Sequence, residues 1–290
     1  MDSNLGLMVL GSAQDGGYPH IGCKEQCCQP AWIDLNKKRL VASIAIIDKK
    51  SNECWIIDAS PDIKHQINMI IDFLEIDTVP KIKGIFLTHA HTGHYSGLLE
   101  LGKEALNSFN IPLYVMPRMY NFIQSNEPFR FLMDSKNIFL KPIEEKEQIN
   151  LSTEVSINSF LVPHRNELSE TVGYKIRARK KTIIYLPDID SWDDWDENIL
   201  DIIDDNDILL IDGTFYDKNE LNNREISKIP HPSIIESMEK FSVLDRKAKN
   251  KIFFTHFNHT NTAIQETHLS NMSLIEQGYK IVNDGDFFCI

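Results

Sequence analysis

Three of the ten histidines of this 290-residue chain lie within one short segment, His89-Ala90-His91-Thr92-Gly93-His94. The apolar run Ile82 to Leu87 before them predicts a buried strand, and the pattern from Tyr95 to Asn107 predicts a helix. Neutral imidazole is the commonest metal ligand, and histidines on one strand-to-helix turn can bind a single ion. A lone histidine there would more often be structural, so it is the clustering that predicts a metal site.

An apolar strand followed by Asp or His occurs six times along the chain. The residues that follow these strands are Asp58, His89, His164, Asp188, Asp212 and His256. Ligands in layered α/β proteins gather where loops converge over the ends of a rigid sheet, so we expect these side chains at one sheet edge. Asp58 and Asp212 also fit a role as turn or helix-capping residues, and the sequence leaves both roles open.

The elements that must position these residues follow from local patterns. We expect a first strand at Leu7–Leu10, a hairpin of Val41–Asp48 with Cys54–Ile57, and an amphipathic helix over Ile63–Leu74. Without repeats or a linker, residues 1–290 are interpreted as a single domain. His20, His65 and His268 have no companions in the sequence and are interpreted as surface or structural, and Trp192 and Trp195 as packing residues.

Composition restricts the classes of partner. A formal net charge of -12 without a Lys/Arg-rich stripe disfavours nucleic acid, and a small-molecule substrate is expected instead. No apolar run approaches the length of about 18 residues that a membrane span needs, and Met1–Leu10 does not have the pattern of a signal peptide. Five cysteines, an odd number, argue against a disulfide framework and favour the cytoplasm. A homodimer is compatible with the sequence.

The histidine turn, followed by a distant His, Asp and His, resembles the metallo-β-lactamase fold hydrolases, whose signature H-x-H-x-D-H lies on such a turn. The resemblance implies an α/β fold, a four-layer α/β/β/α sandwich. More narrowly, the chain resembles the pyrroloquinoline-quinone biosynthesis protein B branch, and its layout is similar to the cyclic-phosphate phosphodiesterases of phosphonate utilisation. The segments that carry the narrower resemblance are Gly11-Ser12-Ala13 with the cysteines after it, Ser60-Pro61-Asp62, and His256-Phe257-Asn258-His259-Thr260-Asn261.

Carried across residue by residue, the resemblance implies a two-metal site. The implied ligands are His89, His91 and His164 for the first ion, Asp188 as a bridge, and His94 with His256 for the second ion. Gly93 departs from the signature, which places there an Asp that ligates the second metal. We therefore expect a second ion that is weaker, absent or of another kind, and an additional ion in Gly93→Asp.

A separate structural zinc is implied by the cysteines. Cys23, Cys27 and Cys28 offer three thiolates, and a closed zinc site takes four ligands. In the related families the fourth ligand is a His three residues after the last active-site His, which corresponds to His259. The spacing here is C-x3-C-C instead of C-x-C-x2-C, and free buried thiols are the alternative.

Two functions fit these residues. The first is a metal-dependent hydrolase for an ester, amide or phosphodiester of a small molecule, with one or two catalytic zinc ions (or iron or manganese) activating water. Asp188 and His94 are its catalytic candidates. Arg165 and His231 are its substrate-binding candidates. The alternatives are that Arg165 forms a surface salt bridge and that His231 is an ordinary loop residue. The alternative is a non-haem iron oxygenase of cofactor or natural-product biosynthesis, built on His94, His256 and Asp188.

Overall fold

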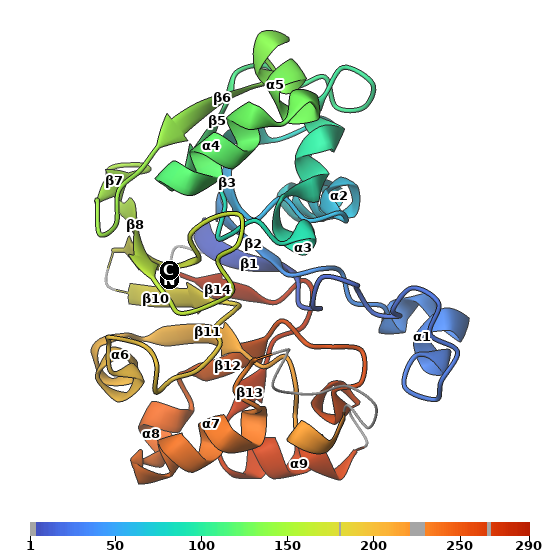
Figure 1. Cartoon of the computed structure of the whole chain (residues 1–290), viewed down its shortest axis with the longest axis vertical. Coiled ribbons are helices and arrows are strands. Elements are labelled where there is room, and N and C mark those ends of the chain that lie inside the picture. The colour runs from blue at the N-terminus through green and yellow to red at the C-terminus, as the bar shows by residue number, and fades with distance from the viewer. Residues whose placement is uncertain (1–3, 180, 221–229, 266–267) are drawn as a thin grey trace.

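Two seven-stranded β-sheets form the centre of the molecule (Figure 1). The computed structural model describes residues 4–179, 181–220, 230–265 and 268–290. The first sheet has the order β14-β1-β2-β3-β4-β5-β6, formed by β1 (Leu5–Gly11), β2 (Ser43–Asp48), β3 (Glu53–Ile57), β4 (Lys81–Phe86), β5 (Ile111–Val115), β6 (Ile138–Pro142) and β14 (Phe287–Cys289). The second has the order β13-β12-β11-β10-β9-β8-β7, formed by β7 (Ile149–Asn150), β8 (Val155–Leu161), β9 (Val172–Ala178), β10 (Lys181–Leu186), β11 (Ile208–Asp212), β12 (Ile252–Thr255) and β13 (Lys280–Ile281).

Helices cover the outer face of each sheet, which makes four layers (Figure 1). Over the first sheet lie α2 (Ile63–Leu74), α4 (Pro117–Ser125) and α5 (Glu127–Asp134). Beside the second lie α6 (Ile199–Asp205), α7 (Ile234–Lys240), α8 (Arg246–Lys249) and α9 (Leu269–Glu276). A short helix, α1 (Gln29–Ile33), belongs to an N-terminal arm that stands out from this body. The arrangement confirms the predicted α/β/β/α sandwich.

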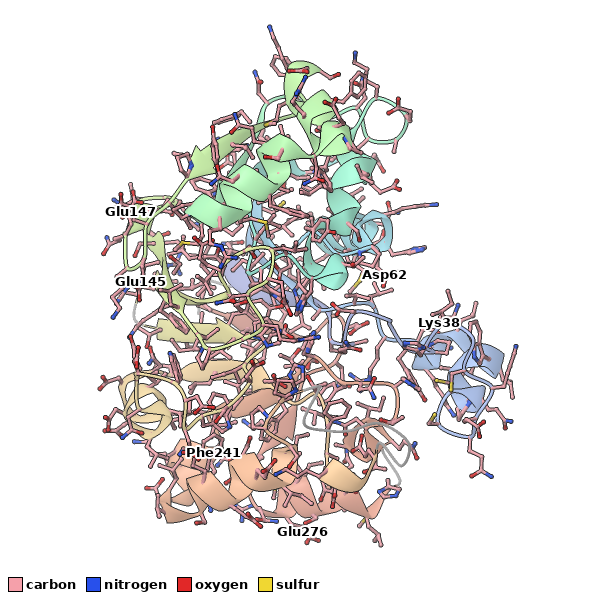
Figure 2. The ribbon with its side chains drawn as sticks, in the orientation of Figure 1. Lys38, Asp62, Glu145, Glu147, Phe241 and Glu276 are labelled. Atoms are coloured by element: carbon pink, nitrogen blue, oxygen red, sulfur yellow. The ribbon has the colours of Figure 1, made fainter. Side chains whose placement is uncertain are left out.

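Successive side chains of a strand point to opposite faces of its sheet, so each central strand contributes to two apolar cores. In β1, Leu7 and Val9 join the core between the sheets, whereas Met8 and Leu10 join the core beneath the helices. All four side chains are buried. A strand covered on both faces needs a continuous apolar run, which is what the sequence shows here. Figure 2 shows the side chains that fill the space between the layers.

Several predicted elements are confirmed. The strands β2 and β3 pair as an antiparallel hairpin, and α2 has the predicted bounds. Trp192 and Trp195 are buried, with ring centroids 6.4 Å apart. Within the described part of the chain, none of the helices combines the length and apolar character of a membrane span. The first three residues of Met1–Leu10 lie outside the described residues.

The helix predicted from Tyr95 to Asn107 is wrong. The turn instead forms α3 (Thr92–Tyr95) and a 3-10 helix over Ser96–Leu101, and the chain then continues without a helix to β5. The cause is a tertiary contact with the loop after β3. Ala59 N donates to the carbonyl of His94, and Gly97 N donates to the carbonyl of Ala59, both at 2.9 Å. Hydrogen bonds to Ala59 thus take up backbone groups that a continuous α-helix would pair internally.

Gly97 is required as glycine by this contact. A Cβ atom at position 97 would lie 1.9 Å from the carbonyl oxygen of Ser60. We expect Gly97→Ala to lower the free energy of unfolding by about 2 kcal/mol, because overpacking against backbone forces the chain to shift. Ser96→Ala is the matched control, because it removes a buried hydroxyl that has no partner among the described residues and should change stability by less than about 0.5 kcal/mol. Denaturant unfolding measures both variants, and equal stability of the two would contradict this account.

Candidate metal centre

The histidine turn lies where the chain leaves β4 and enters α3. His91 caps α3 with an extended backbone (φ -86°, ψ 147°), and His94 N donates to the carbonyl of His91 at 2.9 Å. His89 and His94 are buried, whereas His91 is only half-buried. The turn therefore directs two imidazoles into the interior and leaves the third at the rim of the site.

Four predicted ligands of the first ion come together. One ligand atom each of His89, His91, His164 and Asp188 lies within 4.8 Å of the other three. His164 Nε2 is 3.3 Å from His91 Nδ1 and 3.7 Å from Asp188 Oδ1. His164 follows β8 and Asp188 follows β10. The second sheet thus brings these two residues to the turn that the first sheet carries.

The predicted ligands of the second ion lie on the other side of Asp188. Asp188 Oδ2 is 3.3 Å from His94 Nε2 and 3.3 Å from His256 Nε2. His256, after β12, has a positive φ of 62°, a strained conformation for a non-glycine residue that is typical of functional sites. Asp188 lies between the two groups, which is the position that the resemblance implies for a bridging carboxylate.

The chemistry of these residues fits a cation. His89 Nε2, His94 Nε2, His256 Nε2 and Asp188 Oδ2 are buried atoms without a hydrogen-bond partner in the described part of the chain. Each such atom costs about 1–3 kcal/mol when it is left unpaired in a protein interior. Several unpaired imidazole nitrogens converging on a carboxylate make a donor set for a zinc-type ion.

Hydrogen bonds to the Nδ1 atoms orient four of the imidazole ligands. Asp58 Oδ2 lies 2.7 Å from His94 Nδ1, and Asp190 Oδ1 lies 2.6 Å from His164 Nδ1. Thr88 Oγ1 and Thr214 Oγ1 lie 3.0 Å from the Nδ1 atoms of His89 and His256. Such partners fix the ring of a metal-ligating histidine, so these four imidazoles would be held in position to bind an ion.

Asp58 and Asp212, whose roles the sequence left open, lie outside the ligand groups. Asp58 orients His94 and also accepts from Thr88 N at 2.8 Å. Asp212 Oδ2 lies 2.7 Å from His231 Nδ1, and its carboxylate accepts from the backbone N–H groups of Ile189 and Thr214. Both carboxylates therefore hold the strand-end loops in place, as turn-forming carboxylates do.

Burial keeps three of the imidazoles neutral, those of His89, His91 and His256. It lowers the pKa of His89 and of His256 well below the usual range, and neighbouring imidazoles lower both further. It also lowers the pKa of His91 to about 4. Neutral imidazole is the form that binds a metal, so these three side chains are ready to ligate at neutral pH.

His94 and Asp188 titrate differently. Burial would lower the pKa of His94, but the carboxylates of Asp58 and Asp188 outweigh it and raise this pKa to about 10. Burial raises the pKa of Asp188 to about 6, against the opposing effect of His94 and His164. In the metal-free protein His94 is therefore an imidazolium at neutral pH.

The two substrate-binding candidates lie beside this centre. His231 is buried, with its ring centroid 5.4 Å from that of His164 and 6.2 Å from that of His256. Arg165 is exposed and lines a hollow of about 250 Å³ together with His91 and Ser169. The plain-loop interpretation of His231 is wrong, because the Asp212 hydrogen bond fixes its ring against the site.

The cysteine cluster forms a second centre at the base of the N-terminal arm. Cys23 Sγ is 3.7 Å from Cys27 Sγ, and His259 Nδ1 is 3.6 Å from Cys27 Sγ and 3.4 Å from Cys28 Sγ. Ligands of one tetrahedral zinc lie roughly 3.5–3.8 Å apart, given Zn–S of about 2.3 Å. The ring of His20 packs against that of His259, with centroids 4.5 Å apart and a tilt of 32°, which agrees with its interpretation as a structural residue.

Sequence reasoning missed two acids of the site. Asp190 is the partner of His164, and its proximity to Asp188 in the chain was the available signal. Asp15, in the loop after β1, forms a third ligand group with His94 and His256. Asp15 also comes after an apolar strand, but it does not follow the strand end directly. It lies within a glycine-containing segment that the sequence indicated only as a turn.

Comparison with known families agrees with this geometry. The family model described as the beta-lactamase superfamily domain matches residues 55–257, which include the histidine turn, His164, Asp188 and His256. The chain belongs to the beta-lactamase superfamily. The superfamily match ends before His259 and begins after the cysteine cluster, so the second centre lies outside it.

Relatives within the superfamily extend over nearly the whole chain. A coenzyme PQQ synthesis protein B of Methylorubrum extorquens is 25% identical over 300 residues, which cover 96% of this chain and 98% of that protein. The structure of Zn²⁺-bound PqqB from Methylobacterium extorquens superposes with a TM-score of 0.81 at 22% identity, covering 98% of this chain and 100% of the other. A diphosphatase of the PhnP family superposes with a TM-score of 0.69 at 22% identity, covering 99% and 98%. The narrower resemblance to the quinone-biosynthesis branch is confirmed.

The pKa of His94 gives a testable pH dependence. An ion that binds His94 should displace one proton at neutral pH, because a pKa of about 10 keeps this imidazole protonated in the metal-free protein. His91, with a pKa of about 4, should release none. Affinity at His94 therefore rises with pH until about pH 10. Calorimetric titration with metal in buffers of different ionisation enthalpy counts the protons.

Asp58→Asn tests whether the neighbouring carboxylate causes the proton release from His94. It lowers the pKa of His94 and loosens its ring, so proton release should fall and affinity for the ion at His94 should drop about 10–100-fold. Asp72→Asn, on α2, is the charge-matched control and should change neither quantity. Binding at His94 without proton release in the unsubstituted protein would contradict the electrostatic account.

Proposed function

We propose that this protein is a metal-dependent hydrolase that acts on an ester, amide or phosphodiester bond of a small molecule. The observation that carries the proposal is the convergence of unpaired, buried ligand atoms from both sheets on Asp188. Superfamily membership supports it, because metal-assisted hydrolysis is the chemistry that the resemblance implies. His89, His91 and His164 provide three imidazoles, the set that catalytic zinc uses in some hydrolytic enzymes, and Asp188 lies beside them as the bridging carboxylate.

Each residue of the site has a part in this chemistry. A bound zinc would polarise the scissile bond and lower the pKa of water. Asp188, whose carboxylate lies between the two ligand groups, is placed to orient a water molecule or to accept its proton. Asp58 and Asp190 keep the imidazoles of His94 and His164 in position. His231, fixed by Asp212, presents its ring to the same space and can donate to a substrate oxygen.

The position of Arg165 favours a substrate that carries an anionic group. Its guanidinium is exposed at the rim, in the hollow that also contains His91. Guanidinium groups bind carboxylate and phosphate oxygens in pairs. The hollow of about 250 Å³ suits a small group rather than a polymer. A phosphodiester or a carboxylate-bearing ester is therefore the preferred substrate class within the proposal.

The cysteine centre is proposed to bind a structural zinc. Burial raises the pKa of the Cys28 thiol to about 12 and also raises the pKa of Cys27, so neither is a thiolate at neutral pH without a cation. A closed three-Cys, one-His site would connect the N-terminal arm to the loop that carries His256 and His259.

The iron oxygenase is the second candidate, because His94 and His256 each lie 3.3 Å from Asp188 Oδ2. These three residues form the two-His, one-carboxylate set of non-haem iron enzymes. Two facts favour the hydrolase. First, His89, His91 and His164 place three more imidazoles on the other side of Asp188. Second, Asp15 adds another carboxylate beside His94 and His256.

The proposed hydrolysis is tested with a panel of chromogenic carboxyl esters, lactams and phosphodiesters. We expect turnover of at least one class that a chelator abolishes and zinc or manganese restores. His89→Ala should lower kcat/KM at least about 100-fold, the effect of disturbing even an outer partner of a ligand. His65→Ala, an exposed histidine of α2, is the matched control and should leave kcat/KM unchanged.

Iron-dependent oxygen consumption without hydrolysis would replace the proposal by the oxygenase. Chelator-resistant hydrolysis, or a His89→Ala variant as active as the unsubstituted protein, would also overturn it.

Arg165→Ala should raise KM for anionic substrates about 5–10-fold, as expected for one exposed charged contact of about 1 kcal/mol. A neutral ester should lose little, since it offers no anion to the guanidinium. Arg130→Ala, an exposed arginine of α5, is the control. Steady-state kinetics on paired neutral and anionic substrates measure the difference. An equal loss on both classes would show that Arg165 does not recognise charge.

A further inference from the structure

The space beside Gly93 is already occupied by a carboxylate. A Cβ atom built at position 93 would lie 2.1 Å from Asp15 Oδ1, 2.8 Å from its Cα and 3.0 Å from its Cγ. Gly93 and Asp15 are far apart in the chain, and they meet because the loop after β1 lies over the histidine turn. A side chain at position 93 would therefore collide with Asp15, which argues against the sequence-based expectation that Gly93→Asp adds an ion.

The Asp15 carboxylate points into the metal centre. Its Oδ1 atom is buried without a hydrogen-bond partner among the described residues, in the same way as His94 Nε2 and His256 Nε2. The three residues each bring a ligand atom within 4.8 Å of the other two. Oδ1 lies 3.5 Å from His94 Nε2. That separation is too long for a strong ionic hydrogen bond, but it is close to the roughly 3.0–3.4 Å between two ligands bound at about 2.1 Å to one ion.

The backbone around Asp15 is held by the chain next to His256. Gln14 N donates to the carbonyl of Phe257 at 2.9 Å, and Phe257 N donates to the carbonyl of Ser12 at 2.8 Å. The other carboxylate oxygen, Oδ2, accepts from Gln14 Nε2 at 3.3 Å. Asp15 and His256 therefore form a preorganised pair, placed by one short stretch of main-chain pairing.

We propose that Asp15 is a ligand of the second metal ion, with His94 and His256, and that it supplies from the N-terminal loop the carboxylate that Gly93 lacks. Glycine at position 93 is then a requirement, because any side chain there would push Asp15 out. The inference rests on the proposed metal centre, but it does not depend on which bond the enzyme cleaves.

An alternative role for Asp15 is that of a counter-ion for protonated His94. His94 already has the Asp58 carboxylate at 2.7 Å on its Nδ1 atom, and Asp188 at 3.3 Å on Nε2. A third carboxylate with an unpaired buried oxygen adds little to that ion pair. An ion at the Nε2 side satisfies Oδ1 and both imidazole nitrogens together.

The test counts metal in the full-length protein. The chain is equilibrated at a fixed free zinc concentration, and bound zinc is measured by mass spectrometry. We expect three ions per chain in the unsubstituted protein: one at the cysteines, one at His89, His91 and His164, and one at Asp15. Asp15→Asn, which keeps the size and removes the charge, should lose one ion or bind it at least about 100-fold more weakly.

Two further variants make the outcome specific. Gly93→Ala leaves every proposed ligand intact but places a Cβ against Asp15, so it should lose the same ion as Asp15→Asn. Glu25→Gln makes the same change of charge at an exposed position between the cysteines, and it should keep three ions. Cobalt substitution reports the same site through its visible absorption, which should change in Asp15→Asn and Gly93→Ala. Retention of the cysteine-bound ion verifies that each variant is folded.

The experiment distinguishes failure of the Asp15 inference from failure of the proposed function. If Asp15→Asn and Gly93→Ala retain the full metal content, affinity and cobalt spectrum, Asp15 is not a ligand, and the proposed hydrolase stands without it. If the unsubstituted protein binds no ion beyond the cysteine-bound one, both this inference and the proposed function are overturned.

Discussion

Buried nitrogen and oxygen atoms without partners are the constraint on which this structure depends. His89, His94 and His256 direct Nε2 atoms, and Asp188 an oxygen, into one interior space where these atoms have no hydrogen-bond partner among the described residues. Folding alone would not tolerate several such atoms, because each costs about 1–3 kcal/mol. Their arrangement is stable only if a cation satisfies them or if the surrounding fold holds them against that cost.

The two sheets provide that hold. Carboxylates and hydroxyls contact the Nδ1 atoms of His89, His94, His164 and His256, so these four imidazoles are held from outside the site. Asp58 closes β3 against the histidine turn of β4, and Asp212 does the same for β10 and β11 through Ile189 N. Neither sheet carries a complete ligand set, so the site exists only where the sheets pack together.

The N-terminal segment is as much a part of the site as the superfamily core. It contains Asp15, which faces His94, and the three cysteines, which meet His259. The same short loop after β12 carries both His256 and His259. The proposed structural zinc and the proposed active-site ions therefore share one connection, and ordering of the arm is expected to order the loop that presents His256.

Local pattern in the sequence determined the first strand, the hairpin after it, the strands that end in His or Asp, α2 and the identity of most ligands, because such patterns are readable within a few residues. It also determined the departure at Gly93. Only the tertiary structure decided that the helix after Tyr95 breaks against Ala59, that Asp58 orients His94, and that Asp212 orients His231. It alone also decided that Asp15 fills the space beside Gly93. Each of these depends on which distant segments come into contact. A single sequence encodes such contacts without displaying them, since spacing along the chain says nothing of distance across two packed sheets.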